Sequence, residues 1–155
     1  MAIEEFKETD PSMVSIAKLI TIIAKGLSIY LSHNLESFGI NPTQLLLLFE
    51  ISHQENLNQE KIAKRCNINK GAVARSIKKL EDNGFVLRTI DENNRRQNKV
   101  SLTPKGKETL KNAFKVLQSW ENEVIKEKGY VDKEVLQLVL KEIAIKTMEL
   151  NKKEE

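Results

Sequence analysis

Several residue types that build enzyme sites, metal sites and secreted folds are scarce in this chain. It contains one cysteine, Cys66, so no disulfide can form within it. Its two histidines, His33 and His53, share no metal-ligand spacing with that cysteine. The sequence holds no phosphate-binding loop and no nucleophile elbow. These absences argue against an enzyme, a metal site or another cofactor.

The first residues lack a secretory signal, because MAIEEFKETD is acidic where a signal would be basic and then apolar. The longest apolar segment, from Met13 to Leu31, is interrupted by Lys18 and Lys25. Two charges inside such a segment argue against a membrane span. The sequence therefore predicts a cytoplasmic protein with no membrane partner.

Proline and glycine are few, at three and six residues, and most lie where one patterned segment ends and the next begins. The chain has no internal repeat, low-complexity block or Gly/Ser linker. At 155 residues it suits one domain, residues 1–155, that is long enough to bury a core.

Positive charge is concentrated in one part of the chain. Residues 61–107 hold 13 Lys and Arg against 4 Asp and Glu, a net charge of +9, whereas the rest holds 12 against 18. The formal charge of the whole chain is only +3. This distribution favours a surface that meets nucleic-acid phosphates.

The basic segment has the pattern of a helix-turn-helix followed by a hairpin. Asn58 is placed to cap a short helix, and Asn67 and Asn69 flank a tight turn. A basic helix then runs from Lys70 to Asn83 and ends at Gly84. The segments FVLRTI and KVSLT have the β-branched content of strands, joined by a polar loop.

The basic helix has two chemically different faces. Its apolar residues recur at i, i+4 and i+7, which predicts a buried face of Val73, Ile77 and Leu80. The opposite side carries Lys70, Gly71, Ala74, Arg75 and Lys78. Those cations either form a solvated surface or read DNA, since an arginine can bind guanine with two hydrogen bonds. The glycine either weakens the helix start or permits close approach of DNA.

Cap signals mark the helices on both sides. The residues predicted to cap helix starts are Asn41 with Gln44, Thr103 and Asp132. Gly129 is predicted to end the helix that starts after Thr103. A proline follows Asn41 and Thr103, as is common at the first position of a helix.

The outer helices, in residues 11–38 and 104–150, have apolar faces too wide for a small helix-turn-helix core to cover. We therefore predict that a second subunit covers them. The predicted fold is mainly α with a small β-hairpin wing, in the order α-α-α-α-β-β-α-α. Residues 41–103 form a winged helix-turn-helix between N- and C-terminal dimerisation helices.

The whole pattern resembles the MarR (multiple antibiotic resistance regulator) family of winged-helix transcription factors. INPTQLLLLFEIS resembles the family's second helix, NKGAVARSIKKLEDNGFV its recognition helix, and RRQNKVSLTPKG its wing and return strand. The resemblance implies a homodimer on a pseudopalindromic double-stranded DNA operator. It also implies a regulator, expected to be a repressor, that a small aromatic or amphipathic molecule modulates.

Carried over by motif position, the resemblance places two sets of residues at DNA. Near base edges it places Lys70, Gly71, Ala74 and Arg75, and near phosphate Lys78 and Lys79. Arg96 matches the wing arginine that enters the minor groove, and Arg95 beside it is a second candidate. The family usually has an aspartate two positions earlier, where this chain has Asn94, an amide that cannot neutralise the guanidinium.

Some alternatives stay open at this point. Arg95 and Arg96 could form a plain polar hairpin tip, and the winged helix could serve sequence-independent DNA binding or protein contacts. Tyr30 and Trp120 either line an effector cavity or belong to the core. Cys66 is expected to be inert packing.

Overall fold

The computed structural model describes residues 3–54, 57–91, 94–125 and 132–151, and the side chains of residues 91–98 are outside this description. The chain forms two compact units, Met1–Leu117 and Gln118–Glu155. Residues 104–117 of one long helix belong to the first unit and the rest of that helix belongs to the second.

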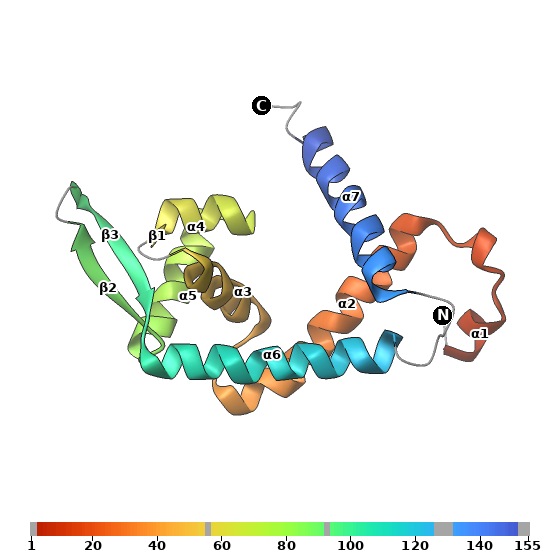
Figure 1. Ribbon diagram of the computed structural model, residues 1–155, viewed down its shortest axis with the longest axis horizontal. Coiled ribbons are helices and arrows are strands. Elements are labelled where there is room, and N and C mark those ends of the chain that lie inside the picture. The colour runs from red at the N-terminus through yellow and green to blue at the C-terminus, as the bar shows by residue number, and fades with distance from the viewer. Residues whose placement is uncertain (1–2, 55–56, 92–93, 126–131, 152–155) are drawn as a thin grey trace. The chain divides into compact units, whose positions relative to one another are not determined.

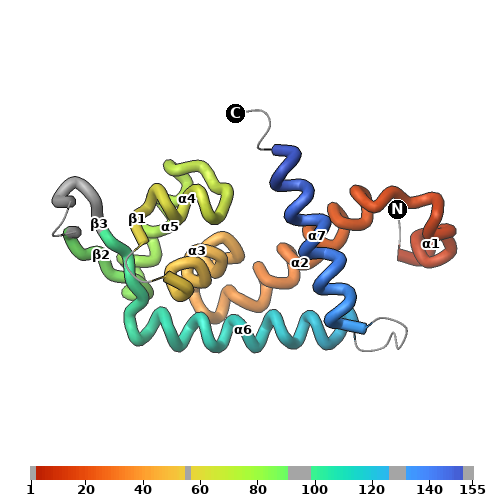
Figure 2. Tube along the Cα trace, turned by 45° about the horizontal axis from the view of Figure 1, so that its top comes forward, coloured from red at the N-terminus to blue at the C-terminus, as the bar shows by residue number. Residues whose placement is uncertain are grey.

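The elements follow the predicted order with additions (Figures 1 and 2). The helices are α1 (Ile3–Glu8), α2 (Ile16–Leu35), α3 (Pro42–His53), α4 (Gln59–Cys66), α5 (Lys70–Asp82), α6 (Pro104–Ile125) and α7 (Lys133–Asn151). Two 3-10 turns, η1 (Pro11–Met13) and η2 (Glu36–Phe38), flank α2. The strands are β1 (Leu57–Asn58), β2 (Val86–Asp91) and β3 (Asn94–Leu102).

The wing is a three-stranded antiparallel sheet in the order β1-β3-β2. Val86 pairs with Leu102 at the root of the hairpin, and the register shifts between Ile90 and Asp91. The sequence predicted only two strands. It missed β1 because a two-residue strand has no periodicity of its own and forms only by pairing Leu57 with Val100. The short helix α1 was also not predicted.

The core of the first unit lies between the helix-turn-helix and the sheet. It is made of leucine, isoleucine, valine and alanine side chains from the end of α2, from α3 to α5, from the sheet and from α6, together with Ile40 before α3 and Phe85 between α5 and β2. Val73, Ile77 and Leu80 are 0% exposed, so the predicted buried face of α5 is confirmed. Burying each such side chain stabilises the fold by about 1.5–3 kcal/mol.

The predicted helix starts are confirmed by their hydrogen bonds. Asn41 and Gln44 form a capping box, in which each side chain accepts from the other residue's backbone N–H, at 2.9 and 3.0 Å. The Thr103 hydroxyl accepts from Gly106 N–H at 3.0 Å. Asp132 Oδ1 accepts from Glu134 N–H at 2.8 Å at the start of α7. The predicted break at Gly129 lies outside the described residues.

The second unit contains the end of α6 and the whole of α7. Lys133 Nζ lies 2.6 Å from Glu121 Oε2 and joins the start of α7 to α6. No residue of α7, all of which is described, is buried within the chain. Its exposed apolar residues are Val135, Leu138, Val139, Leu140, Ile145, Met148 and Leu150.

One described stretch, Ile16–Phe38, is long and apolar enough to cross a membrane by length and composition alone. A core helix of a protein outside the membrane passes the same test. Lys18 and Lys25 lie within this stretch and are exposed. Its apolar exposed residues are Ile16, Ile20, Ile22, Ile23 and Ile29.

Candidate nucleic-acid interface

Three asparagines shape the helix-turn-helix. Asn58 Oδ1 accepts from Lys61 N–H at 2.8 Å and starts α4. Asn67 ends α4 in the left-handed region, with φ of 50°. Asn69 Oδ1 accepts from Gly71 N–H at 2.8 Å and starts α5. The sequence predicted all three roles, because asparagine both caps helices and tolerates left-handed backbone.

Helix α5 presents its predicted polar residues on the side away from the core. The exposed ones are Lys70, Gly71, Arg75, Lys78 and Lys79, while Ala74 is half-buried. In a helix-turn-helix, the second helix lies in the major groove and its N-terminal residues meet base edges. The exposed face of α5 therefore has the position and the charge that such a contact requires.

Two of these lysines have carboxylate partners. Lys70 Nζ lies 2.7 Å from Glu60 Oε1, across the turn from α5 to α4. Lys78 Nζ lies 2.7 Å from Asp82 Oδ1, one turn along α5. The hydrogen bond to Asp82, followed by the charge of that carboxylate, raises the pKa of Lys78. Among the described residues, Arg75 has no ion-pair partner.

Gly71 has a local structural reason that the sequence did not reveal. A Cβ at this position would lie 3.1 Å from Asn69 Oδ1 and 3.5 Å from Arg75 Nη1. The first distance is tighter than ordinary packing, so the glycine leaves room for the cap of its own helix. This room exists whether or not DNA approaches the same backbone.

The wing side chains are the part of the candidate interface that stays a prediction. Arg95 and Arg96, with Asn94 before them, belong to β3 by their backbone, but their side chains lie outside the described residues. At the root of the wing, Arg88 Nε on β2 lies 3.0 Å from Glu81 Oε2 on α5. This contact is one of charge, because Arg88 Nε has no hydrogen-bond partner.

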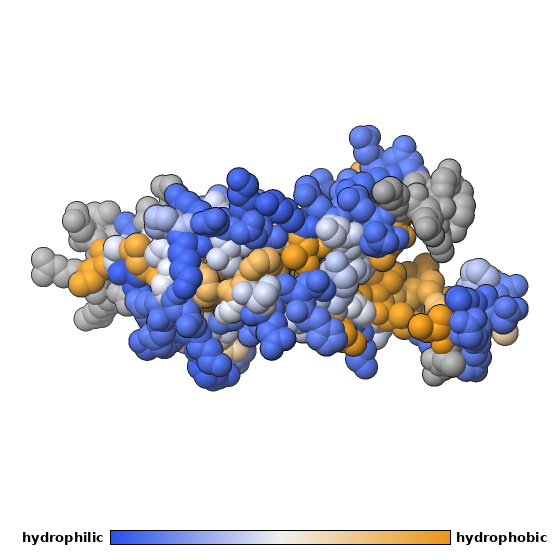
Figure 3. Space-filling view, turned by 90° about the horizontal axis from the view of Figure 1, so that it is seen from below, coloured by the Kyte–Doolittle hydropathy of each residue, from blue (hydrophilic) through white to orange (hydrophobic). Residues whose placement is uncertain are grey.

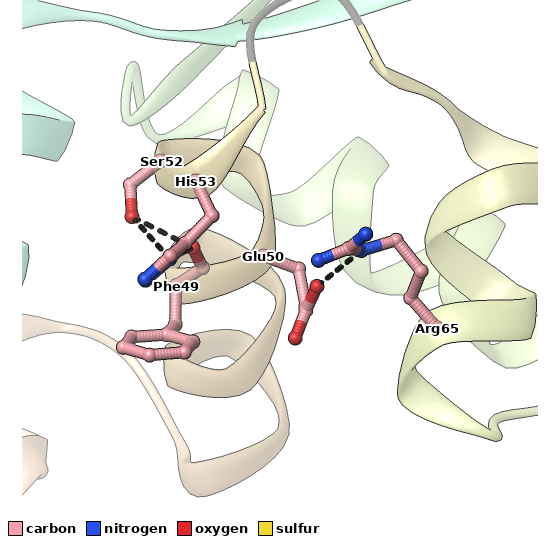
Figure 4. Close-up of polar contacts among 5 residues, drawn as sticks. All are labelled: Phe49, Glu50, Ser52, His53 and Arg65. Carbon is pink, nitrogen blue, oxygen red and sulfur yellow. Dashed lines mark hydrogen bonds and ion pairs between the residues drawn. The ribbon is translucent and has the colours of Figure 1, made fainter.

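Polar contacts also lie within α3 and between α3 and α4 (Figure 4). Arg65 Nε donates to Glu50 Oε2 at 2.6 Å, and His53 Nδ1 lies 2.9 Å from the Phe49 carbonyl. Cys66 is half-buried beside this pair, as predicted for a packing residue. Burial raises the pKa of the Cys66 thiol, and the charge of Glu50 raises it further. The charge of Arg65 lowers it by less than these two raise it. The thiol therefore forms the reactive thiolate less readily than an exposed thiol does.

A family model described as MarR family matches residues 40–97, which run from the start of α3 into the wing. Residues 40–97 therefore form a MarR-family winged helix-turn-helix. Members of this family are winged helix-turn-helix transcriptional regulators and not enzymes. The fold described above, with its N- and C-terminal helices and its small wing, is the fold of that family.

Individual relatives resemble this chain to different extents. It is 33% identical to the transcriptional regulator SarZ of Staphylococcus epidermidis over 89 residues, 57% of this chain and 60% of SarZ. A MarR transcriptional regulator from Methanosarcina mazei is 29% identical, with a TM-score of 0.75 over 88% of this chain and 96% of that one. A mutant of MarR from E. coli complexed with operator DNA is 21% identical, with a TM-score of 0.73 over 87% and 99%.

The chain also has a junction that the sequence did not single out. Lys105 Nζ in α6 donates to the Asn83 carbonyl at the end of α5, at 2.7 Å, and lies 4.5 Å from the centre of the Phe85 ring. The Thr103 hydroxyl donates to the Gly84 carbonyl at 2.7 Å. The end of α5, the wing root and the start of α6 are therefore held by one set of bonds.

The two residues predicted to bind an effector lie in different units. Tyr30, in α2, is half-buried and packs against the core of the first unit. Trp120, in α6, is half-buried in the second unit. No cluster of three metal-ligating side chains occurs among the described residues.

Proposed function

We propose that this MarR-family chain is a sequence-specific DNA-binding repressor that occupies a pseudopalindromic operator as a homodimer. The observation that carries the proposal is the division of α5 into two faces. Val73, Ile77 and Leu80 are fully buried, whereas Lys70 and Arg75 are exposed on the opposite side. A helix fixed by its apolar face can hold an arginine in the geometry that base recognition requires.

The position of α5 assigns a role to each segment of the chain in this proposal. Residues 41–103 serve as the DNA-binding lobe, and residues 11–38 and 104–150 as dimerisation helices. Lys70, Gly71, Ala74 and Arg75 face the bases, and Lys78 and Lys79 face phosphate. Arg95 and Arg96 of the wing reach the minor groove or phosphate. Operator binding by the E. coli relative of the same fold supports this assignment.

The homodimer is supported by apolar surface that the single chain leaves open. In α7, Val135 is 58% and Leu138 is 59% exposed, and in α2, Ile16 is 67% exposed. Figure 3 shows apolar side chains open on one face between hydrophilic ones. Monomeric proteins rarely expose so many large apolar side chains on two helices, because contiguous patches of this kind are covered by partners. A second copy would cover both faces without a membrane, in the cytoplasm.

The regulating signal in this proposal is a small aromatic or amphipathic molecule. It would bind next to Tyr30 or Trp120 and favour a separation of the two recognition helices that does not match successive major grooves. Such a ligand acts only through its different affinity for the two arrangements of the dimer.

The test is a footprint over the DNA upstream of the gene for this chain, compared with random duplex at the same salt concentration. We expect a protected pseudopalindrome and an affinity for it about 10³-fold or more above that for random DNA. Equal affinity for both would favour a sequence-independent DNA-binding module and refute the proposal.

A further inference from the structure

The ion pair between Glu60 and Lys70 lies where the proposed function places DNA. Glu60 is in the first turn of α4 and Lys70 is the first residue of α5. Their Oε1 and Nζ atoms are 2.7 Å apart, although ten residues separate them in the sequence. Both side chains stay open to solvent, at 72% exposed for Lys70 and 52% for Glu60. DNA can therefore reach the lysine.

The carboxylate is ionised at neutral pH. The hydrogen bond from Lys70 holds the pKa of Glu60 below its ordinary value, and the charges of Lys70 and Lys64 act in the same direction. The charge of Glu60 is thus always present when DNA approaches, and it repels phosphate.

Lys70 also lies at the end of α5 where a cation is disfavoured. The N-terminus of a helix carries partial positive charge, so it favours anions and opposes lysine. Glu60 supplies the anion that this position needs in the free protein. A phosphate, or an electronegative base edge, would supply the same chemistry in the complex.

We propose that Glu60 competes with DNA for Lys70, so that the lysine must exchange its carboxylate for a DNA acceptor when the complex forms. This inference rests on the proposed function. The exchange is feasible because an ion pair so open to solvent is weakly held. The Lys78–Asp82 pair differs, since it lies along one helix and joins no second element.

The experiment measures the affinity of four proteins for operator and random duplexes over a series of salt concentrations. They are the wild type, Glu60→Gln, Lys70→Gln and the double variant. We expect Glu60→Gln to bind both duplexes about 3- to 10-fold more tightly at 0.1 M salt, with a salt slope steeper by about one unit. A gain in affinity cannot come from partial unfolding of the variant.

The double variant shows whether Glu60 acts through Lys70. In the Lys70→Gln background, we expect the gain from Glu60→Gln to fall below about twofold, leaving only the direct repulsion of phosphate. The matched control is Glu4→Gln in α1, outside the proposed DNA-binding lobe and dimerisation helices, which removes a second exposed ion pair, with Lys7 at 3.0 Å, and changes the net charge equally. It should leave both affinities unchanged.

Three results would overturn the inference. These are no gain in Glu60→Gln, weaker binding by it, or an equal gain with and without Lys70. A wild type that binds operator and random DNA equally would instead refute the proposed function, while the comparison on random duplex would still decide the role of Glu60.

Discussion

Gly106, in the first turn of α6, lies directly against the carbonyl oxygen of Phe85. A Cβ at position 106 would overlap that oxygen, which belongs to the backbone and cannot move aside as a flexible side chain could. The same carbonyl accepts a hydrogen bond from Thr103 N–H at 3.0 Å. The approach of α6 to the wing root therefore requires glycine at this position.

We expect Gly106→Ala to lower the free energy of unfolding by about 1–3 kcal/mol, because α6 or the wing root must shift to admit the methyl group. Urea unfolding followed by circular dichroism measures this change. The matched control is Gly26→Ala in α2, where a Cβ would meet nothing within 4 Å. That substitution should stabilise its helix by about 0.5–1 kcal/mol. A loss of stability in Gly26→Ala equal to that in Gly106→Ala would contradict the explanation.

Substitutions on α5 separate base reading from phosphate binding. We expect Arg75→Ala to cost about 1–3 kcal/mol of operator affinity and to relax the preference at one base pair per half-site. Lys79→Ala should weaken operator and random DNA alike and lower the salt slope by about one unit. Titrations of both duplexes at several salt concentrations measure these effects. If both variants lose affinity for the two duplexes equally, α5 does not read sequence.

Val139→Asp tests the homodimer. Val139 is 49% exposed in the single chain, so an aspartate there costs the fold of one subunit little. Within a covered apolar face, the same charge would cost several kcal/mol unless the interface opens. We expect sedimentation to show a dimer for the wild type and a monomer for Val139→Asp. The neighbouring exposed Gln137→Asp is the control and should stay dimeric. A folded wild-type monomer at micromolar concentration would refute the dimer.

The thiol of Cys66 gives a prediction for pH and for oxidants. Because burial raises its pKa, the reactive thiolate forms only at a higher pH than in an exposed thiol. Alkylation of Cys66 by iodoacetamide should therefore be slower than that of a model thiol at neutral pH. The increase of the alkylation rate with pH should occur at a higher pH than for the model thiol. Mild peroxide should leave operator binding intact. Release by peroxide that disappears in Cys66→Ser would show that the thiol is a sensor.

The parts of the fold that the sequence predicted are those with local causes. The caps at Asn41, Asn58 and Asn69 were predictable because a side chain and the backbone two or three residues later decide them. The buried stripe of α5 was predictable because its spacing follows the helical period.

Long-range contacts hid the rest of the candidate interface. The strand β1 exists only through its pairing with β3, and the need for Gly106 comes from the backbone of Phe85, which lies far along the chain. The Glu60–Lys70 pair likewise depends on how the turn brings two helices together. For Gly106 the sequence did offer one signal, because a glycine inside a predicted helix often marks a position where another part of the chain comes close.

The room that Gly71 leaves for the Asn69 cap sets a rule for changing the DNA preference of this protein. The exposed residues of α5 can be substituted without disturbing Val73, Ile77 and Leu80, so the helix can be redesigned to bind a different DNA sequence. Position 71 is different, since a side chain there would press on the cap that starts the helix. A designed library should therefore randomise the exposed Lys70 and Arg75 and retain glycine at 71, even though that glycine faces solvent.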